Sequence, residues 1–528
     1  MTIYNSTLPT EYWQNLIISN SDVEFIQNHL FEIEQPLSSE DLAKAIISER
    51  IRLEGENQSK QKSNNSVPYL PSHSYEIGQV VNFPALNFKQ GSIVSIRDGK
   101  NPDFPDFKVM TVEFEAAAPK QFAFELNGHN LDHALSTEAR EDEQQQVQNR
   151  FGKQIEKKIT TALANKNSGL IQIAYRWFPE ALLVSINEGE LNLAEAILEM
   201  NAPKPLTTKE LLAQLQTREG ENPDLLEFSM NFALQEDGRF DEVGPKGLIL
   251  WCLLRFEPEE VLTPPALLSY IPIDYDRSLM TEEELKFEES MADELSEMDR
   301  ESLESPEVKI ALTFPHWRVG TLPIASNACD FFPTSFEAPR VLFSMNVVPQ
   351  GEEVTAWVVR DHGYVYGLRE MFEKYKLIPG SIITLRKDPK TEKISIDFGT
   401  KKANKEWMRT VLAGTDGGLV FALLKQEVST EFNERLAMAI PDIDSVDTAI
   451  ELSHKSNRKL VNMVKGVLAE LAKLNPQGHV HIEELYSAIN ILVRIPPAPL
   501  LAIINSSEYF VHIGDLHYRL KELEQEGS

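Results

Sequence analysis

Cations alternate with aromatic residues between Lys309 and Arg409, and this combination suits contact with a nucleic acid. The span holds fifteen Lys and Arg against eleven Asp and Glu, so it is net basic in a chain of net charge −30. Guanidinium and ammonium groups bind phosphate oxygens, while aromatic rings stack on bases. The residues predicted to contact nucleic acid are His316, Trp317, Arg318, Arg340, Arg360, Tyr364, Arg369, Arg386, Lys387, Lys390, Lys393, Lys401 and Lys402.

The same residues have a second interpretation. Trp357, Tyr364 and Tyr366 would then be half-buried residues of a β barrel, and the lysines would only keep its surface soluble. The two interpretations differ in one respect, which is whether a coherent positive surface exists. Nucleic-acid binding requires cations that gather on one surface without being neutralised by local carboxylates.

Motifs for catalysis are absent from the sequence. It contains no phosphate-binding P-loop, no Gly-x-Gly-x-x-Gly after a strand, no His-Glu-x-x-His, no Cys-x-x-Cys and no Gly-x-Ser-x-Gly. His479 and His481 form a His-x-His pair, but the pair falls at a helix start, so we predict a surface or capping role for it. We therefore expect a non-enzymatic protein with no catalytic residue, metal or cofactor; an enzyme of another type is the third-ranked hypothesis.

Composition indicates an ordinary globular chain in a reducing compartment. Apolar residues make up 42% of the 528 residues, and roughly 100–200 residues per domain gives three to five domains. Cys252 and Cys329 lie far apart in apolar contexts, which argues against a disulfide framework. No basic and apolar leader precedes residue 20, and no apolar run approaches ~18 residues. We expect a cytoplasmic protein without a membrane partner.

Two segments are predicted to form small β barrels. From 308 to 402, β-branched and aromatic runs such as VLFSMNVV and SIITLRK are separated by Pro and Gly turns, with one helix from Leu368 to Tyr375. From 67 to 134, the alternation in KVMTVEFE and the glycines between runs predict a five-stranded barrel of SH3-like size.

The remaining segments are predicted to be helical or to connect domains. Between Asp274 and Glu307 we count fourteen acids against three bases, and we predict a solvated, partly helical acidic linker. Beyond Lys402 we predict a helix that extends the positive surface through Lys405 and Arg409. The fold class is α+β and multidomain, with winged-helix-like helical units alternating with two small β barrels. The expected domains are 1–64 (helical), 67–134 (barrel), 140–273 (helical), 274–307 (linker), 308–402 (basic barrel) and 403–528 (helical).

One phrase occurs three times. It reads QPLSSEDLAKAI, KPLTTKELLAQL and GHVHIEELYSAI, and each copy leads into an amphipathic helix. Ser38 with Asp41, and Thr207 with Glu210, have the spacing of a capping box, in which hydroxyl and carboxylate satisfy each other's backbone amides. His481 replaces the hydroxyl in the third copy and predicts a weaker cap.

A hairpin follows the second and third copies. GRFDEVGPKGLILWCLL and YFVHIGDLHYRL each read as two strands around a turn, after a second helix. Helix, helix, hairpin is the order of a winged helix. The N-terminal copy lacks the hairpin, so we expect that copy to be truncated.

These two phrases resemble the HARE-HTH winged helix, a domain found in the delta subunit of bacterial RNA polymerase and in some chromatin and restriction-linked proteins. The resemblance covers about a third of the chain. The delta subunit is strongly acidic, so the resemblance makes a transcription role compatible with the net charge. The barrel at 308–402 resembles B3-type DNA-binding pseudobarrels in topology.

The second helices depart from helices that read DNA. NPDLLEFSMNFALQ and PAPLLAIINSSEY carry no Lys or Arg, whereas base readout in the major groove uses Arg, Lys, Asn or Gln. We expect DNA as the partner of the basic barrel, with a transcription-associated role. The alternative is an acidic scaffold that binds RNA polymerase or another protein without touching nucleic acid.

Overall fold

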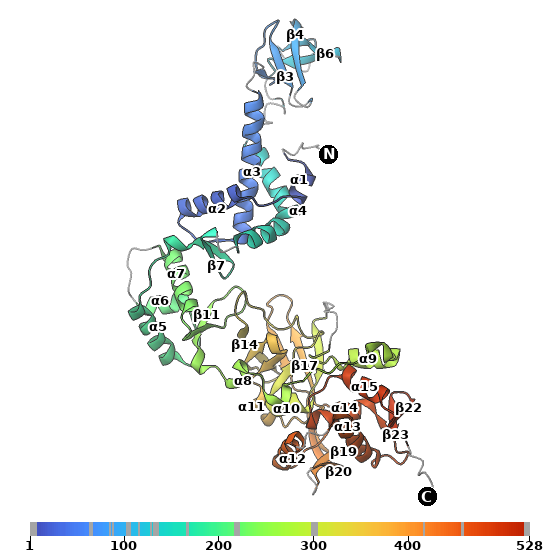
Figure 1. The fold of residues 1–528 in the computed structure, drawn as a ribbon. Helices are drawn as coiled ribbons and strands as arrows, with labels where there is room; N and C mark the ends of the chain where they lie inside the picture. Colours follow the sequence, from blue (N-terminus) through green and yellow to red (C-terminus); the bar gives the residue numbers. More distant parts are fainter. Residues whose placement is uncertain are drawn as a thin grey trace. The chain divides into compact units, whose positions relative to one another are not determined.

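A computed structural model describes residues 8–62, 67–83, 86, 89–101, 107–114, 117–126, 129, 137–164, 168–215, 222–296, 305–414, 418–455 and 459–521. The chain mixes α-helices with several β-sheets, in agreement with the predicted α+β class (Figure 1). It divides into two compact units, Met1–Ser185 with Arg218–Met230 and Ile186–Thr217 with Asn231–Ser528.

The first unit begins with helices around a single hydrophobic core. The helices are α1 (Thr10–Gln14), α2 (Asn20–Ile33), α3 (Ser39–Lys62) and α4 (Thr137–Leu163). Trp13, Ile26, Leu30 and Ile155 are buried together in that core. The apolar faces of α2, α3 and α4 therefore stabilise one another, as expected of amphipathic helices.

Between α3 and α4 the chain forms a five-stranded sheet, which agrees with the five strands predicted for 67–134. Its strands, in spatial order, are β2 (Val67–Pro68), β3 (Val80–Phe83), β4 (Lys89–Asp98), β5 (Lys108–Phe114) and β6 (Ala117–Phe124). Phe83, Met110 and Phe124 point into its core, where each is at most 1% exposed. The alternation in KVMTVEF gives the burial pattern expected of a strand with one buried face.

A three-stranded sheet with the same design occurs three times in the chain. Each sheet joins the short strand of a recurring phrase to a hairpin that follows two helices. The strands are β1 (Leu37–Ser38), β7 (Leu170–Ile173) and β8 (Arg176–Pro179); β9 (Leu206–Thr207), β10 (Phe240–Glu242) and β11 (Leu250–Leu253); and β21 (Val480–His481), β22 (Phe510–Gly514) and β23 (His517–Leu520). In each sheet an aliphatic residue of the short strand pairs with an aromatic residue of the hairpin: Leu37 with Trp177, Leu206 with Trp251, and Val480 with Tyr518.

The N-terminal copy is therefore complete, and our expectation that it lacks a hairpin was wrong. Its hairpin, β7–β8, follows α4, after the five-stranded sheet has been inserted between its two helices. The Trp177 indole donates a hydrogen bond of 2.9 Å to the Ser39 hydroxyl, and the Trp251 indole donates one of 3.2 Å to Thr208. The Ser-Ser and Thr-Thr pairs of the first two phrases thus supply a helix cap and then an acceptor for a buried indole.

The predicted helix caps are confirmed. The Asp41 amide donates to the Ser38 hydroxyl at 3.1 Å. The Glu210 amide donates to the Thr207 hydroxyl at 3.2 Å, and the Thr207 amide donates back to the Glu210 carboxylate at 2.8 Å. In the third copy the Glu483 amide donates to His481 Nδ1 at 3.2 Å, so His481 has the capping role predicted for it.

In the second unit, residues 307–397 form a seven-stranded, nearly closed barrel-like sheet. Its spatial order is β12-β17-β18-β14-β15-β16-β13. The strands are β12 (Glu307–Ala311), β13 (Thr321–Pro323), β14 (Arg340–Val348), β15 (Glu352–Val359), β16 (Tyr364–Tyr366), β17 (Ile382–Lys387) and β18 (Ile394–Asp397). Helix α10 (Phe314–Val319) joins β12 to β13, and α11 (Arg369–Lys374) lies within the helix predicted from Leu368 to Tyr375.

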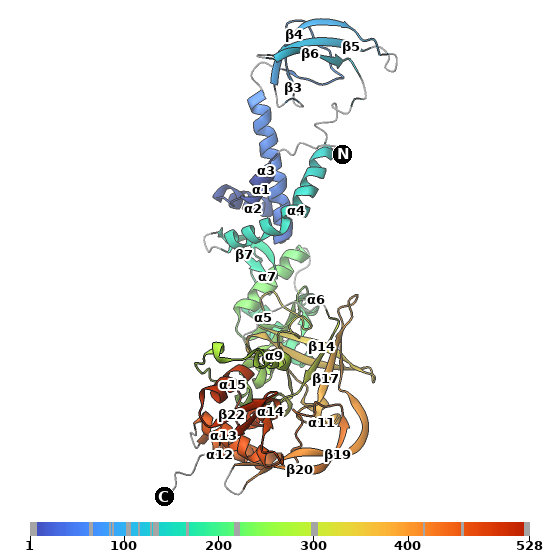
Figure 2. The ribbon, with the colours of Figure 1, turned by 90° about the vertical axis from the view of Figure 1, so that its right-hand side faces the viewer.

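The chain continues as strand, not helix, beyond Lys402. Strand β19 (Thr400–Ala413) pairs with β20 (Leu419–Thr430) in a long antiparallel ribbon, which is curved in Figure 2. The predicted helix was therefore wrong, and β19 and β20 form a sheet of their own, separate from the seven-stranded sheet. Val411 and Phe421 pack against the C-terminal helices, and this contact supports strand pairing over the helical propensity of the lysines.

Helices fill the rest of the second unit. They are α5 (Glu188–Asn201), α6 (Thr208–Leu215), α7 (Pro223–Glu236, part of which belongs to the first unit), α8 (Glu259–Leu262), α9 (Glu282–Met291), α12 (Ile443–Lys455), α13 (Leu460–Ala472), α14 (Ile482–Leu492) and α15 (Pro497–Ser506). No single helix in the described ranges is long and apolar enough to cross a bilayer, although α14 and α15, bent by 107°, meet that criterion together.

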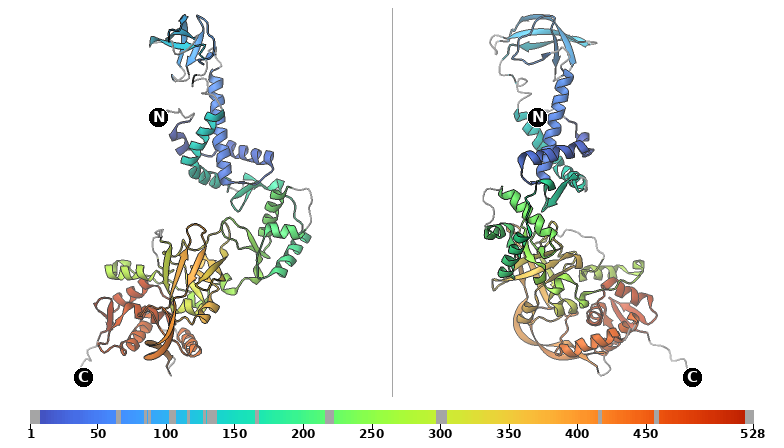
Figure 3. Two further views of the ribbon diagram at one scale, coloured as in Figure 1. Left: turned by 180° about the vertical axis from the view of Figure 1, so that it is seen from behind. Right: turned by 60° about the vertical axis from the view of Figure 1, so that its left-hand side comes forward.

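The acidic segment is not a solvated linker over its described part. Helix α9 lies against α15 (Figure 3), and Glu284 and Phe287 are 1% and 3% exposed. The Asn505 amide and the Tyr518 hydroxyl both donate to the Glu284 carboxylate. The few apolar residues of this segment are thus enough for it to pack against the C-terminal core. Residues 297–304 of the predicted linker lie outside the described residues.

Candidate nucleic-acid interface

Three of the predicted arginines bind groups within the protein. Arg318 forms an ion pair with Asp447 at 2.7 Å. Arg340 binds the carboxylates of Asp241 and Glu257, the latter at 3.0 Å. Arg360 donates to backbone carbonyls, including that of Phe332 at 2.7 Å. These three guanidinium groups connect segments of the fold, and their charge is largely neutralised or buried.

The Arg340 contacts form a partly buried acidic cluster. Burial, with the neighbouring Asp241 as hydrogen-bond partner, raises the pKa of Glu257 to about 8. Burial also raises the pKa of Glu242, and the negative charges of Glu337 and Asp241 raise it further, to about 7. At neutral pH this cluster therefore holds protons that the same carboxyl groups would lose in water.

The two buried aromatic residues of the prediction cannot reach a ligand in this structure. His316 and Tyr364 are each 1% exposed. The Tyr364 hydroxyl donates to the Glu260 carbonyl at 2.6 Å, and the half-buried Trp317 donates its indole N–H to the Leu377 carbonyl at 2.7 Å. The prediction that His316 and Tyr364 contact nucleic acid is corrected, because both belong to the core.

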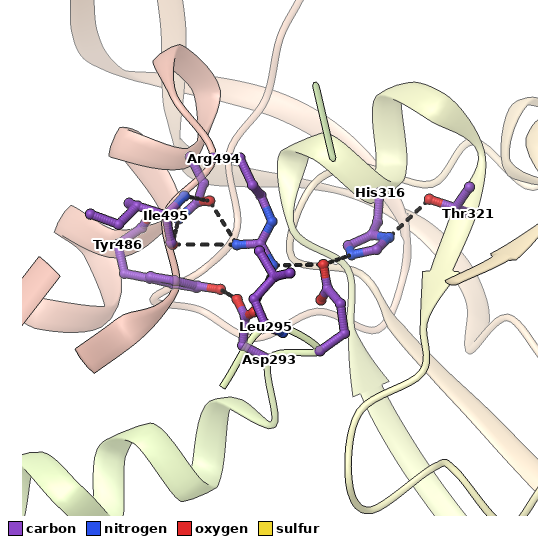
Figure 4. Close-up of polar contacts among 9 residues, drawn as sticks. Asp293, Leu295, His316, Thr321, Tyr486, Arg494 and Ile495 are labelled. Atoms are coloured by element: carbon purple, nitrogen blue, oxygen red, sulfur yellow. Dashed lines mark hydrogen bonds and ion pairs between the residues drawn. The ribbon is translucent and has the colours of Figure 1, made fainter. Parts of the chain in front are cut away.

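His316 belongs to a buried polar network that joins α10 to the C-terminal helices (Figure 4). Its Nδ1 shares a hydrogen bond of 2.8 Å with the Thr321 hydroxyl, and its Nε2 lies 3.1 Å from Glu294 Oε1. Arg494 lies 2.7 Å from Glu294 and 2.6 Å from Asp293. Burial alone would raise the pKa of Glu294, but Arg494 and His316 hold it well below its ordinary value.

The same network includes the hydroxyl of a buried tyrosine. Tyr486 of α14 donates to the Asp293 carboxylate, and burial together with that negative charge raises the pKa of Tyr486 well above its ordinary value. Arg494 also donates to the Asn490 side-chain oxygen at 3.0 Å. Each carboxylate of the network lies beside the Arg494 guanidinium, and Asp293 also accepts from Tyr486, so we assign the network a structural role.

The remaining predicted cations are exposed, except for the half-buried Lys387, and they differ in whether a carboxylate neutralises them. Arg369 pairs with Glu373, and Arg386 pairs with Glu307 at 2.8 Å. Lys401 lies 3.5 Å from Glu406 and over the Phe432 ring. Lys387 donates only to a backbone carbonyl. No ion pair within the described residues joins a carboxylate to the following exposed lysines: Lys390, Lys393, Lys402 and Lys405.

These four lysines lie in the most basic part of the unit. Lys390 and Lys393 belong to the turn between β17 and β18, and Lys402 and Lys405 belong to β19. From 376 to 409 the sequence has nine Lys and Arg against four Asp and Glu. Beside the turn, a hollow of about 450 Å³ is lined by the cations Arg386, Lys387 and Lys393 and by the carboxylates Glu307 and Asp388. Because Arg386 pairs with Glu307, the lysines are the cations of this hollow that remain for an anionic ligand.

Two residues of the β19–β20 ribbon were not among the residues predicted from sequence. Trp407 of β19 is 68% exposed, and Lys425 of β20 lies over its ring at 5.4 Å from the centroid. Trp407 follows Lys405 by two residues, so the two side chains lie on the same face of the ribbon. Residues 400–405 before Trp407 are exposed without alternation, so the sequence offered no strand signal there, and the segment was predicted to be helical.

Comparison of the chain with protein-family models, with curated proteins and with solved structures found no match. Within the described residues, no group of three or more His, Cys, Asp or Glu side chains has the arrangement of a metal site.

Proposed function

We propose that this chain is a non-enzymatic nucleic-acid-binding protein whose phosphate contacts come from the β17–β18 turn and from β19. The proposal rests chiefly on one observation: in a chain of net charge −30, the segment from 376 to 409 has net charge +5 and carries four exposed lysines without a carboxylate partner among the described residues, two in the β17–β18 turn and two on β19. Local excess of cations, more than total charge, decides where phosphates bind. DNA is the proposed ligand, and the role is transcription-associated.

This proposal is narrower than the set of residues predicted from sequence. It retains Lys387, Lys390, Lys393 and Lys402 as phosphate contacts and adds Lys405. It gives the arginines that bind internal groups a structural role. Because lysine is a flexible point charge, such a surface positions a backbone without reading base sequence.

We also infer that the three repeated units, each with two helices and a hairpin, are winged helices that serve as structural and protein-binding modules. In the C-terminal repeat, α15 is the second helix and so corresponds to a recognition helix, yet seven of its ten residues are buried. Neither α15 nor α7 carries Lys or Arg. Helices of this composition support packing more than entry into a major groove.

A protein-binding scaffold is the second candidate function, with RNA polymerase or another protein as partner. The observation that favours it is the exposure of apolar side chains on β20, where Val420, Leu423 and Leu424 are 38%, 46% and 40% exposed. Apolar residues grouped on one exposed ribbon are typical of a protein contact.

Binding of the whole chain to labelled duplex DNA at low salt distinguishes the two candidates. We expect the triple variant Lys390→Gln, Lys393→Gln, Lys402→Gln to lose at least about ten-fold in affinity. The control carries the same charge change at exposed lysines elsewhere, Lys44→Gln, Lys455→Gln and Lys473→Gln. Equal affinities for the two triple variants, or no binding by the unmodified chain, would reject nucleic-acid binding in favour of the scaffold.

A further inference from the structure

Trp407 is the only exposed tryptophan of the six in the chain. Trp13, Trp177 and Trp251 are at most 2% exposed, and Trp317 and Trp357 are half-buried, whereas Trp407 is 68% exposed. The exposed indole leaves a large apolar area in water. A ring in this position is accessible to a ligand outside the chain.

The position of Trp407 on the ribbon places one cation over its ring and a second cation two residues away on the same face. It pairs across the ribbon with Lys425, and Lys405 pairs with Glu427 one step further along the same face. The Lys425 ammonium lies 5.4 Å from the ring centroid, which is a cation–π contact. On the paired strands, residues 400–413 and 419–430, five Lys and Arg stand against two Glu, and one of these cations, Arg409, is paired with Glu484. The ribbon therefore keeps a net positive charge, which favours an anionic ligand over an apolar protein segment.

We propose that Trp407 stacks on an unpaired base and that Lys405 and Lys425 bind the phosphates beside it, so that single-stranded nucleic acid is the preferred ligand. A base has a π-face on which an indole can stack, and its backbone supplies the charge that the lysines require. In a duplex the base faces are covered by their neighbours, so the ring gains nothing there. This inference rests on the proposed function, since it specifies the ligand of β19, one of the two elements to which that proposal assigns phosphate contacts.

The test compares single-stranded oligothymidylate of about 20 nucleotides with a duplex of the same length, both titrated with the whole chain. We expect Trp407→Ala to weaken single-strand binding by about 5- to 150-fold, the range for loss of one base–aromatic stack, and to leave duplex binding unchanged. Trp407→Phe keeps a stacking ring and should restore most of the affinity. The control Phe31→Ala removes a ring that is 45% exposed on α2 and should have no effect.

Intrinsic fluorescence gives an independent readout, because the single exposed indole is the one that a stacked base would quench. Quenching by oligothymidylate should disappear in Trp407→Phe while binding persists. Unchanged single-strand affinity in Trp407→Ala would overturn the inference and assign the ring to a protein partner. In that case, duplex binding that still depends on Lys390, Lys393 and Lys402 would leave the proposed function intact. If the unmodified chain bound neither the single strand nor the duplex, the proposed function itself would be rejected.

Discussion

Substitution of Arg494 by Met should destabilise the C-terminal core more than any surface change of the same kind. The guanidinium is 1% exposed and lies 2.6 Å from Asp293 and 2.7 Å from Glu294, which are themselves 1% and 4% exposed. Met has a similar length and fills the space, so the substitution isolates the charge. Both carboxylates would then be buried without their main counter-charge, and Asn490 would lose a donor.

The expected cost is about 3–5 kcal/mol, the range for a buried ion pair that loses one partner. The control Lys473→Met removes an exposed ion pair with Glu470, where the lysine side chain is 66% exposed. Solvent screens such a pair, so its loss should change stability by less than about 1 kcal/mol. Arg494→Met and Lys473→Met each remove one positive charge, so the difference between their effects on stability reports the burial of the Arg494 ion pairs.

Hydrogen exchange of the whole chain, read by mass spectrometry, is the appropriate assay, since a chain of two compact units need not unfold in one step. Amides of α14, which carries Tyr486 and Asn490, should exchange roughly a hundred- to several-thousand-fold faster in Arg494→Met. Adding Asp293→Asn and Glu294→Gln should restore much of the protection, because no buried charge then remains. Exchange within about ten-fold of the unmodified protein would refute the reasoning.

Two further predictions concern the acidic cluster and the helix caps. In the folded chain Glu257 keeps its proton up to about pH 8, whereas in the unfolded chain it releases the proton near pH 4.5. The melting temperature should therefore fall as the pH rises from about 5 to 8, and this fall should be smaller in Glu257→Gln. A melting temperature of the unmodified chain that does not change with pH would contradict this prediction. Thr207→Ala removes the reciprocal cap of α6 and should cost about 1 kcal/mol by calorimetry, with an unchanged melting temperature as the contrary result.

Local features of the fold could be predicted from sequence because their causes lie within a few residues. The caps at Ser38 and Thr207 depend on partners three positions away. The first hairpin was missed because its strand β8 pairs with β1 across an inserted sheet, and Trp177 lies 140 positions after its partner Leu37. Strand β19 was missed because residues 400–405 are exposed on both faces, so the period-two pattern that marks a half-buried strand is absent there.

The candidate site could be predicted only in part, for an electrostatic reason. Composition located the basic segment, but composition does not say which cations have partners. Arg318 is neutralised by an aspartate 129 positions away, and Arg340 by one 99 positions away. The lysines that remain without such partners are distinguished only by tertiary structure, and so is the exposure of Trp407.

The slope of log affinity against log salt concentration, measured with duplex DNA, tests the central claim most directly. Each lysine that contacts a phosphate contributes about one unit to that slope. The triple variant at Lys390, Lys393 and Lys402 should therefore have a slope about three units shallower than that of the unmodified chain. A slope identical in the two proteins would contradict the assignment of these lysines as the phosphate-binding surface.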